Sequence, residues 1–384
     1  MKTGADLLLE QRCDLLRGRR VGLITNQTGA TSDLQLLARV LARLDWVKLV
    51  ALFGPEHGYA GAAPDAVPVD TGRDRVTELP IYSLYGKTEK PTSEMLERID
   101  TLVFDIQDVG VRFYTYVQTM SCAMEAAAEK DISFIVLDRP NPLTGVSVEG
   151  NVPDVAFSSF LGGYPIALRH GMTIGELANF LNQRFQIDVD LTVVKMEGWQ
   201  REMWYDDTGL IWVPPSPGMP SLRTATVYPG TCLLEGTNVS EGRGTSLPFE
   251  LAGAPWIDGE DLTSRMRDSD LEGCLLRSTE FIPFSSKYSE QKCNGIQIHV
   301  TDRTVFKPVE FGLTLISMIK DLYPTHFEWA FDSMSQHYHF DLLMGTNIVR
   351  GKIHSGVSPR NIFQSWNEET LKFKESRKEF LLYQ

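Results

Sequence analysis

The 384-residue sequence contains no long apolar run and no recognisable secretion signal. No stretch approaches the roughly 18 consecutive apolar residues that a membrane-spanning helix needs. Lys2 is followed only by the run Leu7-Leu8-Leu9, which is too short for the apolar region of a signal peptide. We therefore expect a cytoplasmic protein without a membrane span, although a trimmed, exported chain has the same features.

Cysteine is scarce, and its pattern predicts no cross-links. The five cysteines are scattered, odd in number and never spaced as Cys-x-x-Cys. This pattern indicates reduced thiols rather than a disulfide framework or a zinc knuckle.

Basic residues are also in the minority. There are 37 Lys and Arg against 50 Asp and Glu, which gives a net charge of −13. A nucleic-acid-binding protein normally shows a basic stripe, and its absence here predicts no nucleic-acid partner. A small anionic substrate remains compatible, because a carboxylate needs only one or two local arginines.

The sequence lacks the common cofactor and nucleophile motifs. No G-x-G-x-x-G follows the first expected strand, and no G-K-[ST], G-x-S-x-G or H-E-x-x-H occurs. The glycine-rich stretch 236–245 suits a phosphate, but it lacks the P-loop lysine. We therefore predict no cofactor and no metal.

The first half of the chain alternates apolar strands with helical patterns. Strands are expected at 21–25, 47–53, 101–106 and 132–137, with helices after Ser32-Asp33, after Pro91 and over 116–130. This order predicts an α/β fold with a parallel, doubly wound sheet covered on both faces. A capped helix at 173–185 and a strand at 188–195 follow.

The second half has a different texture. Residues 212–248 are rich in Pro and Gly, which predicts a long loop at a domain junction or a functional site. A strand at 295–300, a helix at 308–322 and a helix capped by Ser365 and Glu368 come later. At roughly 150 residues per domain, the length predicts two domains. The sequence gives no prediction of oligomeric state.

Polar side chains follow all four strands of the first half. In an open parallel sheet, the ligand crevice lies beyond the carboxyl ends of the strands. Turns alone do not require Glu-His, Tyr-x-Tyr or Asp-Arg pairs, so we expect a catalytic cleft there. The side chains concerned are Asn26, Gln27, Glu56, His57, Asp105, Asp108, Arg112, Tyr114, Tyr116, Arg139 and Asn141.

Glu56 is the candidate acid or base. A carboxyl group in a cleft is partly desolvated, which suits it to donate a proton near neutrality. The alternative is that Glu56 caps a helix or pairs with an arginine. His57 either orients Glu56 or the ligand, or is a structural histidine.

For the other polar residues, both a functional and a structural interpretation stay open. Asp105, Asp108, His57 and His170 would make a metal site, but their spacing is nonspecific. Arg112, Arg139, Arg169 and Arg243 are candidate anion ligands, most of which we expect in ion pairs. The tyrosines stack on a sugar or fill space. Asn238, Glu241 and Arg243 lie in the glycine-rich loop, either in the site or in an ordered crossover.

These motifs resemble the NamZ-type exo-β-N-acetylmuramidases, formerly the uncharacterised family DUF1343. The resemblance covers nearly the whole chain and rests on long motifs in order. They include V-G-L-I-T-N-Q-T-G at 21–29, L-F-G-P-E-H-G at 52–58, F-D-I-Q-D-V-G-V-R-F-Y-T-Y at 104–116, D-R-P-N-P at 138–142, L-R-H-G-M-T-I-G-E-L-A at 168–178 and E-G-T-N-V-S-E-G-R-G-T at 235–245.

The resemblance implies a Rossmann-like catalytic domain, 1–222, and a smaller C-terminal α+β domain, 223–384, that closes the cleft. It also implies release of N-acetylmuramic acid (MurNAc) from the non-reducing end of peptidoglycan fragments during wall recycling, with a muropeptide or oligosaccharide as substrate. The family's catalytic carboxylate, the Glu of G-P-E-H-G, is Glu56 here. Family members are often exported, and this chain lacks an export signal.

The residues and the resemblance together give a candidate site. We predict Glu56, His57 and Asp108 as catalytic. The predicted substrate-binding residues are Asn26, Gln27, Asp105, Arg112, Tyr114, Tyr116, Arg139, Asn141, Arg169, His170, Asn238, Glu241 and Arg243. Glycosidases normally use two carboxylates, and the second stays open between Asp105, Asp108 and Glu241, or substrate assistance replaces it. The alternatives are a non-catalytic muropeptide-binding protein and a metal-dependent hydrolase on the same scaffold.

Overall fold

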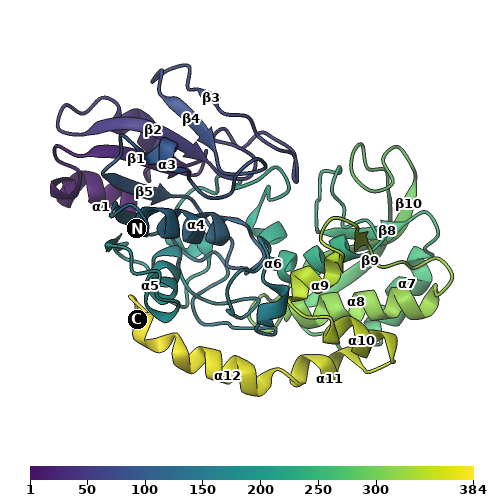
Figure 1. Cartoon of the computed structure of the whole chain (residues 1–384). Helices are drawn as coiled ribbons and strands as arrows, with labels where there is room; N and C mark the ends of the chain where they lie inside the picture. The colour runs from purple at the N-terminus through teal and green to yellow at the C-terminus, as the bar shows by residue number, and fades with distance from the viewer.

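A seven-stranded, mostly parallel sheet forms the centre of the first lobe in the computed structural model, which describes residues 1–384 (Figure 1). The strand order is β3-β4-β2-β1-β5-β6-β7, and only the β3–β4 pair is antiparallel. The strands are β1 (Arg20–Thr25), β2 (Lys48–Gly54), β3 (Gly72–Arg73), β4 (Pro80–Ser83), β5 (Thr101–Asp105), β6 (Ser133–Leu137) and β7 (Leu191–Val194). The predicted fold class is confirmed.

Both faces of this sheet are buried, as the near-continuous apolar strands require. Successive side chains of a strand point to opposite faces, so Leu23 joins one core cluster and Ile24 the other. The first face is covered by α1 (Gly4–Gln11) and α2 (Leu37–Leu41). The second is covered by α4 (Tyr116–Ala128) and α5 (Ile174–Arg184), while α3 (Ser93–Leu96) is a single turn before β5.

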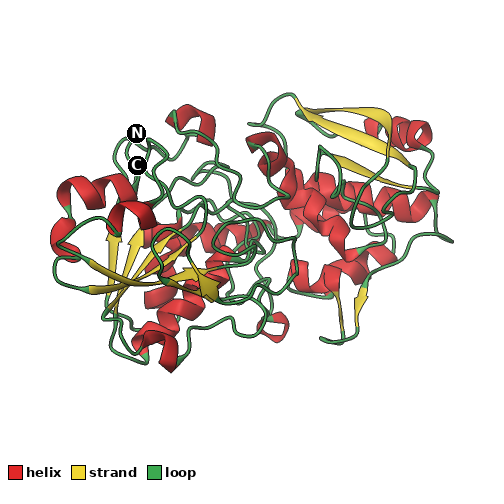
Figure 2. Cartoon of the chain, turned by 90° about the horizontal axis from the view of Figure 1, so that it is seen from above, coloured by secondary structure: helices red, strands yellow, loops and turns green.

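The second lobe is smaller and mixes helices with an antiparallel sheet of order β8-β10-β9 (Figure 2). Its strands are β8 (Leu251–Ala254), β9 (Cys274–Phe281) and β10 (Cys293–Val300), with a hairpin of β11 (Phe331–Asp332) and β12 (His337–Tyr338). Its helices are α6 (Leu222–Thr231), α7 (Gly259–Arg267), α8 (Pro308–Leu322), α9 (His339–Met344), α10 (Ile348–His354) and α11 (Pro359–Gln364). The helix α8 has the bounds that its periodicity predicts.

The expected long loop at 212–248 is partly wrong, because it contains α6. Ser221 caps this helix by accepting the backbone N–H of Thr224. Gly230 lies in α6 because the helix packs closely on α8: a Cβ at this position would lie 1.8 Å from the carbonyl oxygen of Pro308. Gly230, which suggested a loop, therefore allows the close contact between α6 and α8.

The last helix, α12 (Asn367–Ser376), carries the chain from the second lobe back to the first, so both termini lie on the first lobe (Figure 1). Arg377 donates hydrogen bonds to the carbonyls of His170 and Gly171. Tyr383 donates its hydroxyl hydrogen to the carboxylate of Asp138 at the end of β6. The predicted boundary at 222/223 falls at the start of α6, and it stays a prediction.

Two predicted helix starts are wrong for local reasons. Leu34 has a φ of 65°, so no helix begins at Ser32-Asp33, and α2 starts at Leu37. The hydroxyl of Ser365 donates to the carbonyl of Ile362 instead of capping α12. None of the helices combines the length and the apolar character that crossing a bilayer requires.

Candidate active site

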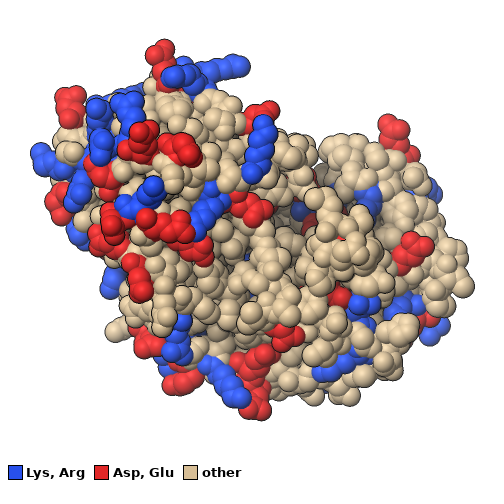
Figure 3. All heavy atoms as spheres, viewed as in Figure 1, with Lys and Arg blue, Asp and Glu red and all other residues tan.

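A cavity of about 650 Å³ lies between the two lobes, and Figure 3 shows the hollow with charged atoms inside it. This volume is in the range that binds small organic ligands, ~300–1,000 Å³. The first lobe contributes polar side chains from the ends of β2 and β4 and from the start of α4. The second lobe contributes a charged cluster. The polar lining residues used below are Glu56, His57, Asp65, Tyr85, Glu89, Tyr114, Thr115, Glu235, Glu241, Arg243, Lys287 and His339.

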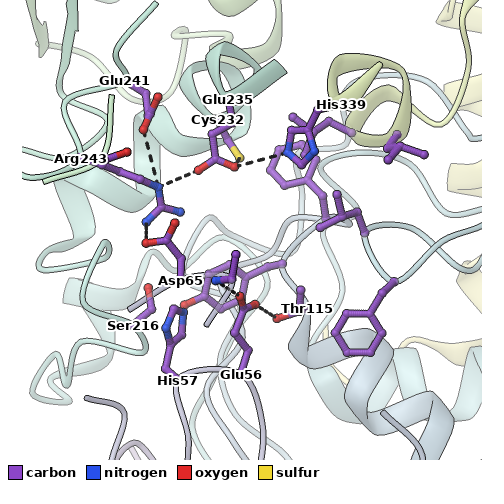
Figure 4. Close-up of a pocket in the computed structure, with 18 of the residues that line it drawn as sticks. Glu56, His57, Asp65, Thr115, Ser216, Cys232, Glu235, Glu241, Arg243 and His339 are labelled. Atoms are coloured by element: carbon purple, nitrogen blue, oxygen red, sulfur yellow. Dashed lines mark hydrogen bonds and ion pairs between the residues drawn. The ribbon is translucent and has the colours of Figure 1, made fainter. Parts of the chain in front are cut away.

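Glu56 lies in this cavity, directly beyond the end of β2. A tight turn after Gly54, closed by the Gly58 N–H on the Pro55 carbonyl at 2.9 Å, turns the side chain out of the sheet. The Glu56 carboxylate is half-buried, and both oxygens accept hydrogen bonds from neutral groups (Figure 4). The Ala66 N–H lies 3.1 Å from Oε1, and the Thr115 hydroxyl lies 2.7 Å from Oε2. Glu56 therefore neither caps a helix nor pairs with an arginine.

His57 holds the loop beside Glu56. Its φ is 67°, a left-handed conformation that costs a non-glycine residue energy and is common at functional sites. Its Nδ1 lies 2.8 Å from the Ala63 carbonyl. A carbonyl only accepts, so Nδ1 carries the hydrogen, and Nε2 is an acceptor in the neutral ring. His57 thus both lines the cavity and fixes the loop that leads to Ala66.

The sequence analysis missed three residues near Glu56, namely Tyr85, Glu89 and Thr115. Tyr85 follows β4, a short strand that begins with a proline and gave no periodic signal. Burial raises the pKa of the Tyr85 phenol, and the neighbouring Glu56 carboxylate adds to this effect, so Tyr85 stays protonated. Burial also raises the pKa of Glu89, which lines the same side of the cavity.

Arg243 connects the two lobes across the cavity. Its Nε donates to Glu235 at 2.7 Å, and its Nη1 donates to Asp65 of the first lobe at 3.1 Å. Burial raises the pKa of Glu235, but Arg243 and His339 outweigh this effect and hold that pKa below its ordinary value. Glu235 is therefore an ionised group on the side of the cavity opposite Glu56 (Figure 4).

The two cations of the cavity differ in their free donors. All three N–H groups of Lys287 are used, on the carbonyls of Leu234 and Val239 and on Glu241 at 2.9 Å. Arg243 uses only Nε and one bond from Nη1, so its Nη2 has no protein partner. Arg243 is thus the cation that can donate to a ligand.

Several predicted substrate-binding residues lie outside the cavity lining and form buried ion pairs. Asp105 and Arg139 form a buried ion pair of 2.6 Å, and Arg139 also donates to the Ala30 carbonyl. Arg169 pairs with Glu149 in the same way. The Asp105–Arg139 pair lies at the ends of β5 and β6, next to the β1/β5 position where a doubly wound sheet usually binds its ligand.

Arg112 is also a structural residue. It is buried, and its guanidinium donates to the carbonyls of Asn151 and Ile166 in the first lobe and of Leu343 and Met344 in the second. The predicted contact with substrate is replaced by a connection between the lobes.

The remaining predicted residues hold the surrounding loops. The Asp108 carboxylate accepts the Gly110 N–H at 2.6 Å and lies 3.6 Å from Nε2 of His170, outside the lining. Asn26, Gln27, Tyr116, Asn141 and Asn238 each bond a nearby backbone group instead of facing the cavity. Of the predicted residues, the structure brings Glu56, His57, Tyr114, Glu241 and Arg243 together at the cavity.

The ligand set for the metal-dependent alternative is not assembled. No group of three or more His, Cys, Asp or Glu side chains is arranged to hold a metal ion. Asp105 is committed to Arg139, and only His57 of the proposed four ligands lines the cavity.

Comparisons with known proteins cover the whole chain. Family models described as exo-beta-N-acetylmuramidase NamZ match it, the N-terminal one at residues 21–223 and the C-terminal one at 226–383. The peptidoglycan beta-N-acetylmuramidase NamZ of Bacillus subtilis (strain 168) is 49% identical over 383 residues, which is 100% of this chain and 91% of that protein.

Two crystal structures of DUF1343 family proteins from Bacteroides fragilis NCTC 9343 share the fold. One has a TM-score of 0.91 at 38% identity, and the other has a TM-score of 0.80 at 32% identity. Each comparison covers 100% of this chain and 99% of the other.

Proposed function

Because the chain belongs to the NamZ family of exo-β-N-acetylmuramidases, we propose that Glu56 is the general acid with which it releases MurNAc from the non-reducing ends of peptidoglycan fragments. The observation that carries this proposal is the place of Glu56 in the interlobe cavity, with neutral hydrogen-bond donors only. A carboxyl group without a cationic partner is free to hold a proton and to transfer it to the glycosidic oxygen.

The second carboxylate of the reaction comes from the second lobe. Of the three residues that the sequence left open, Asp105 and Asp108 lie outside the lining, and Glu241 lies within it. Glu241 and its neighbour Glu235 are paired with Lys287 and Arg243, and they face the cavity from the side opposite Glu56. A fixed negative charge there stabilises the positive charge that develops at the anomeric carbon.

Arg243 binds the lactyl carboxylate of MurNAc in this proposal. A guanidinium grips a carboxylate with two parallel bonds, and Nη2 of Arg243 has a donor available. The Asp65 carboxylate, which is half exposed at 48%, occupies Nη1 in the free protein. The substrate carboxylate takes the place of Asp65.

The first test replaces the proposed acid. Glu56→Gln keeps the shape and both hydrogen bonds to the carboxyl position but removes the transferable proton. We expect kcat on the disaccharide MurNAc-GlcNAc to fall by about 10³-fold, as removal of a general acid typically does. Mass spectrometry of the products measures this, since the wild type is expected to yield free MurNAc and GlcNAc.

The matched control is Glu89→Gln, a carboxylate on the same side of the cavity without a catalytic assignment. We expect both variants to keep the wild-type melting temperature. Undiminished turnover by Glu56→Gln removes Glu56 from the mechanism. Saturable binding of the disaccharide by the wild type without any product supports the non-catalytic, muropeptide-binding alternative instead.

The proposal also includes a cytoplasmic location. A cytoplasmic enzyme of this kind acts on imported disaccharides during wall recycling. Cell fractionation followed by an activity assay tests this location, and activity confined to the culture supernatant contradicts it.

A further inference from the structure

Thr115 lies directly before α4, in the position where a threonine normally caps a helix. Its side chain makes no cap hydrogen bond, and its backbone is already helical, with φ −61° and ψ −13°. Its carbonyl accepts the Thr119 N–H at 2.9 Å and so begins the helix in the usual way. The hydroxyl, which a helix start would ordinarily use, points to Oε2 of Glu56 at 2.7 Å instead.

The two oxygens of Glu56 therefore have different partners. Oε1 accepts the backbone N–H of Ala66, a group that can only donate. Oε2 contacts the Thr115 hydroxyl, which can donate or accept. When Glu56 is protonated, the Ala66 N–H needs the carbonyl oxygen of the carboxyl group, so the proton lies on Oε2.

We propose that Thr115 is a positioning residue that places the proton of Glu56 on Oε2 and stabilises the carboxylate as this proton leaves. The inference rests on the proposed role of Glu56. In the step concerned, the Oε2–H bond breaks and an O–H bond forms on the glycosidic oxygen. The electron pair of the broken C1–O bond stays on that oxygen. Water then adds its oxygen to C1 and releases a proton, and Glu56 is protonated again before the next turnover.

The hydrogen bond from Thr115 strengthens during this step. A hydroxyl bonded to a carboxylate makes a charge-assisted bond, which is about twice as strong as a neutral one. The N-terminus of the 13-residue helix α4 carries a partial positive charge and acts in the same direction. The stabilisation is thus larger in the transition state than in the ground state, which is the condition for acceleration.

Other ionisable groups near Glu56 also set its electrostatic environment, and they are the same in the wild type and in the Thr115 variants. His57 and Asp65 belong to its own loop, Tyr85 and Glu89 follow β4, and Tyr114 and Tyr116 lie at the start of α4. Glu235 and Arg243 face it from the second lobe. All of these groups except Tyr116 line the cavity. Burial is the main cause that raises the pKa values of the phenols of Tyr85, Tyr114 and Tyr116, and the Glu56 carboxylate adds to this effect in each. All of these groups are retained in a variant that lacks only the Thr115 hydroxyl.

The experiment compares Thr115→Val, which replaces the hydroxyl by a methyl group, with Thr115→Ser, which keeps the hydroxyl. Loss of a hydrogen bond to the carboxylate disfavours the charged form, so we expect the alkaline limb of kcat/KM against pH to move up by about 1 unit in Thr115→Val. We expect kcat to fall by about 10- to 100-fold on MurNAc-GlcNAc but by less than about 5-fold on 4-nitrophenyl β-MurNAc. The nitrophenolate leaves with little help from an acid. Thr115→Ser should recover the wild-type profile.

The control variant is Thr119→Val, one turn further along α4. In the wild type the Thr119 hydroxyl donates to the Thr115 carbonyl and not to Glu56. An unshifted alkaline limb with an equal loss on both substrates, in Thr115→Val, overturns the proposal. If Thr115→Val does not fold, Thr115→Ala removes the hydroxyl without adding volume and is judged by the same two readouts. Failure of the proposed acid itself shows separately, as an unchanged rate in Glu56→Gln.

Discussion

Arg243 is the residue that we propose to determine substrate choice. It contacts carboxylates of both lobes and still has a donor free for a third. A lysine cannot reproduce the two parallel bonds of a guanidinium. We expect Arg243→Lys to raise KM for a MurNAc glycoside by about 10- to 100-fold, since a hydrogen bond to a charged group contributes about 1.5–3 kcal/mol. Steady-state kinetics measures this effect.

The control for this prediction is Asp65→Asn, which removes the carboxylate that competes for Arg243. We expect KM to stay constant or to fall. A KM that rises as strongly as in Arg243→Lys indicates that the contact between Asp65 and Arg243 closes the cavity, and it contradicts an exchange of carboxylates.

Individual residues also show how much of the site could be predicted from the sequence. The sequence predicts that Glu56 and His57 lie at the end of a buried strand, because that strand is strongly apolar. The same reasoning selected Asp105 and Arg139, which satisfy each other in an ion pair instead. A sequence does not distinguish a charge aimed at a ligand from one aimed at a partner 34 residues away. Tyr85 and Thr115 gave no signal, since their role arises only from their contact with Glu56.

At the scale of elements, long periodic segments were predictable and short ones were not. The sheet strands and the helices α4, α5 and α8 follow from apolar spacing. The helix α6 was hidden by Pro229 and Gly230, and the place of Gly230 is explained by the close contact of α6 with α8. The short strand β4 and the hairpin β11–β12 depend on their neighbours for stability and have too few residues to show a period.

Of the two capping boxes that the sequence predicts, only one forms, and this difference can be tested. Thr173 and Glu176 form the predicted box at the start of α5, whereas Ser365 does not cap α12. We expect Thr173→Ala to lower the free energy of unfolding by about 1–2 kcal/mol, the usual cost of losing a cap. Ser365→Ala should lower it by less than about 0.5 kcal/mol, as surface substitutions do. Urea denaturation of both variants checks this, and equal losses contradict it.

At the scale of the whole molecule, a buried carboxyl group ties the chain end to the sheet and makes stability depend on pH. Asp138 accepts hydrogen bonds from Tyr383, Thr173 and the Gly175 N–H. Burial raises the pKa of Asp138 to about 7, above its ordinary value of 3.8, although these bonds oppose the shift. Between these two pH values the folded protein binds more protons than the unfolded chain, so stability falls as pH rises.

We therefore expect the free energy of unfolding of the wild type to decrease from pH 5 to pH 8. In Asp138→Asn, which has no proton to lose, this decrease should become smaller. Urea denaturation at several pH values measures both slopes. Parallel curves for the two proteins would falsify the assignment of this pH dependence to Asp138.

The return of the chain to the first lobe limits how the cavity can open. The chain itself joins the two lobes at two places, at the entry into α6 and at the exit through α12, and Tyr383 anchors the end. A body tethered at one point can turn in any direction, but one tethered at two points turns mainly about the line that joins them. We therefore expect any opening of the cavity to follow mainly one rotation axis, so that the width of a glycan, and not only its chemistry, limits its access to Glu56.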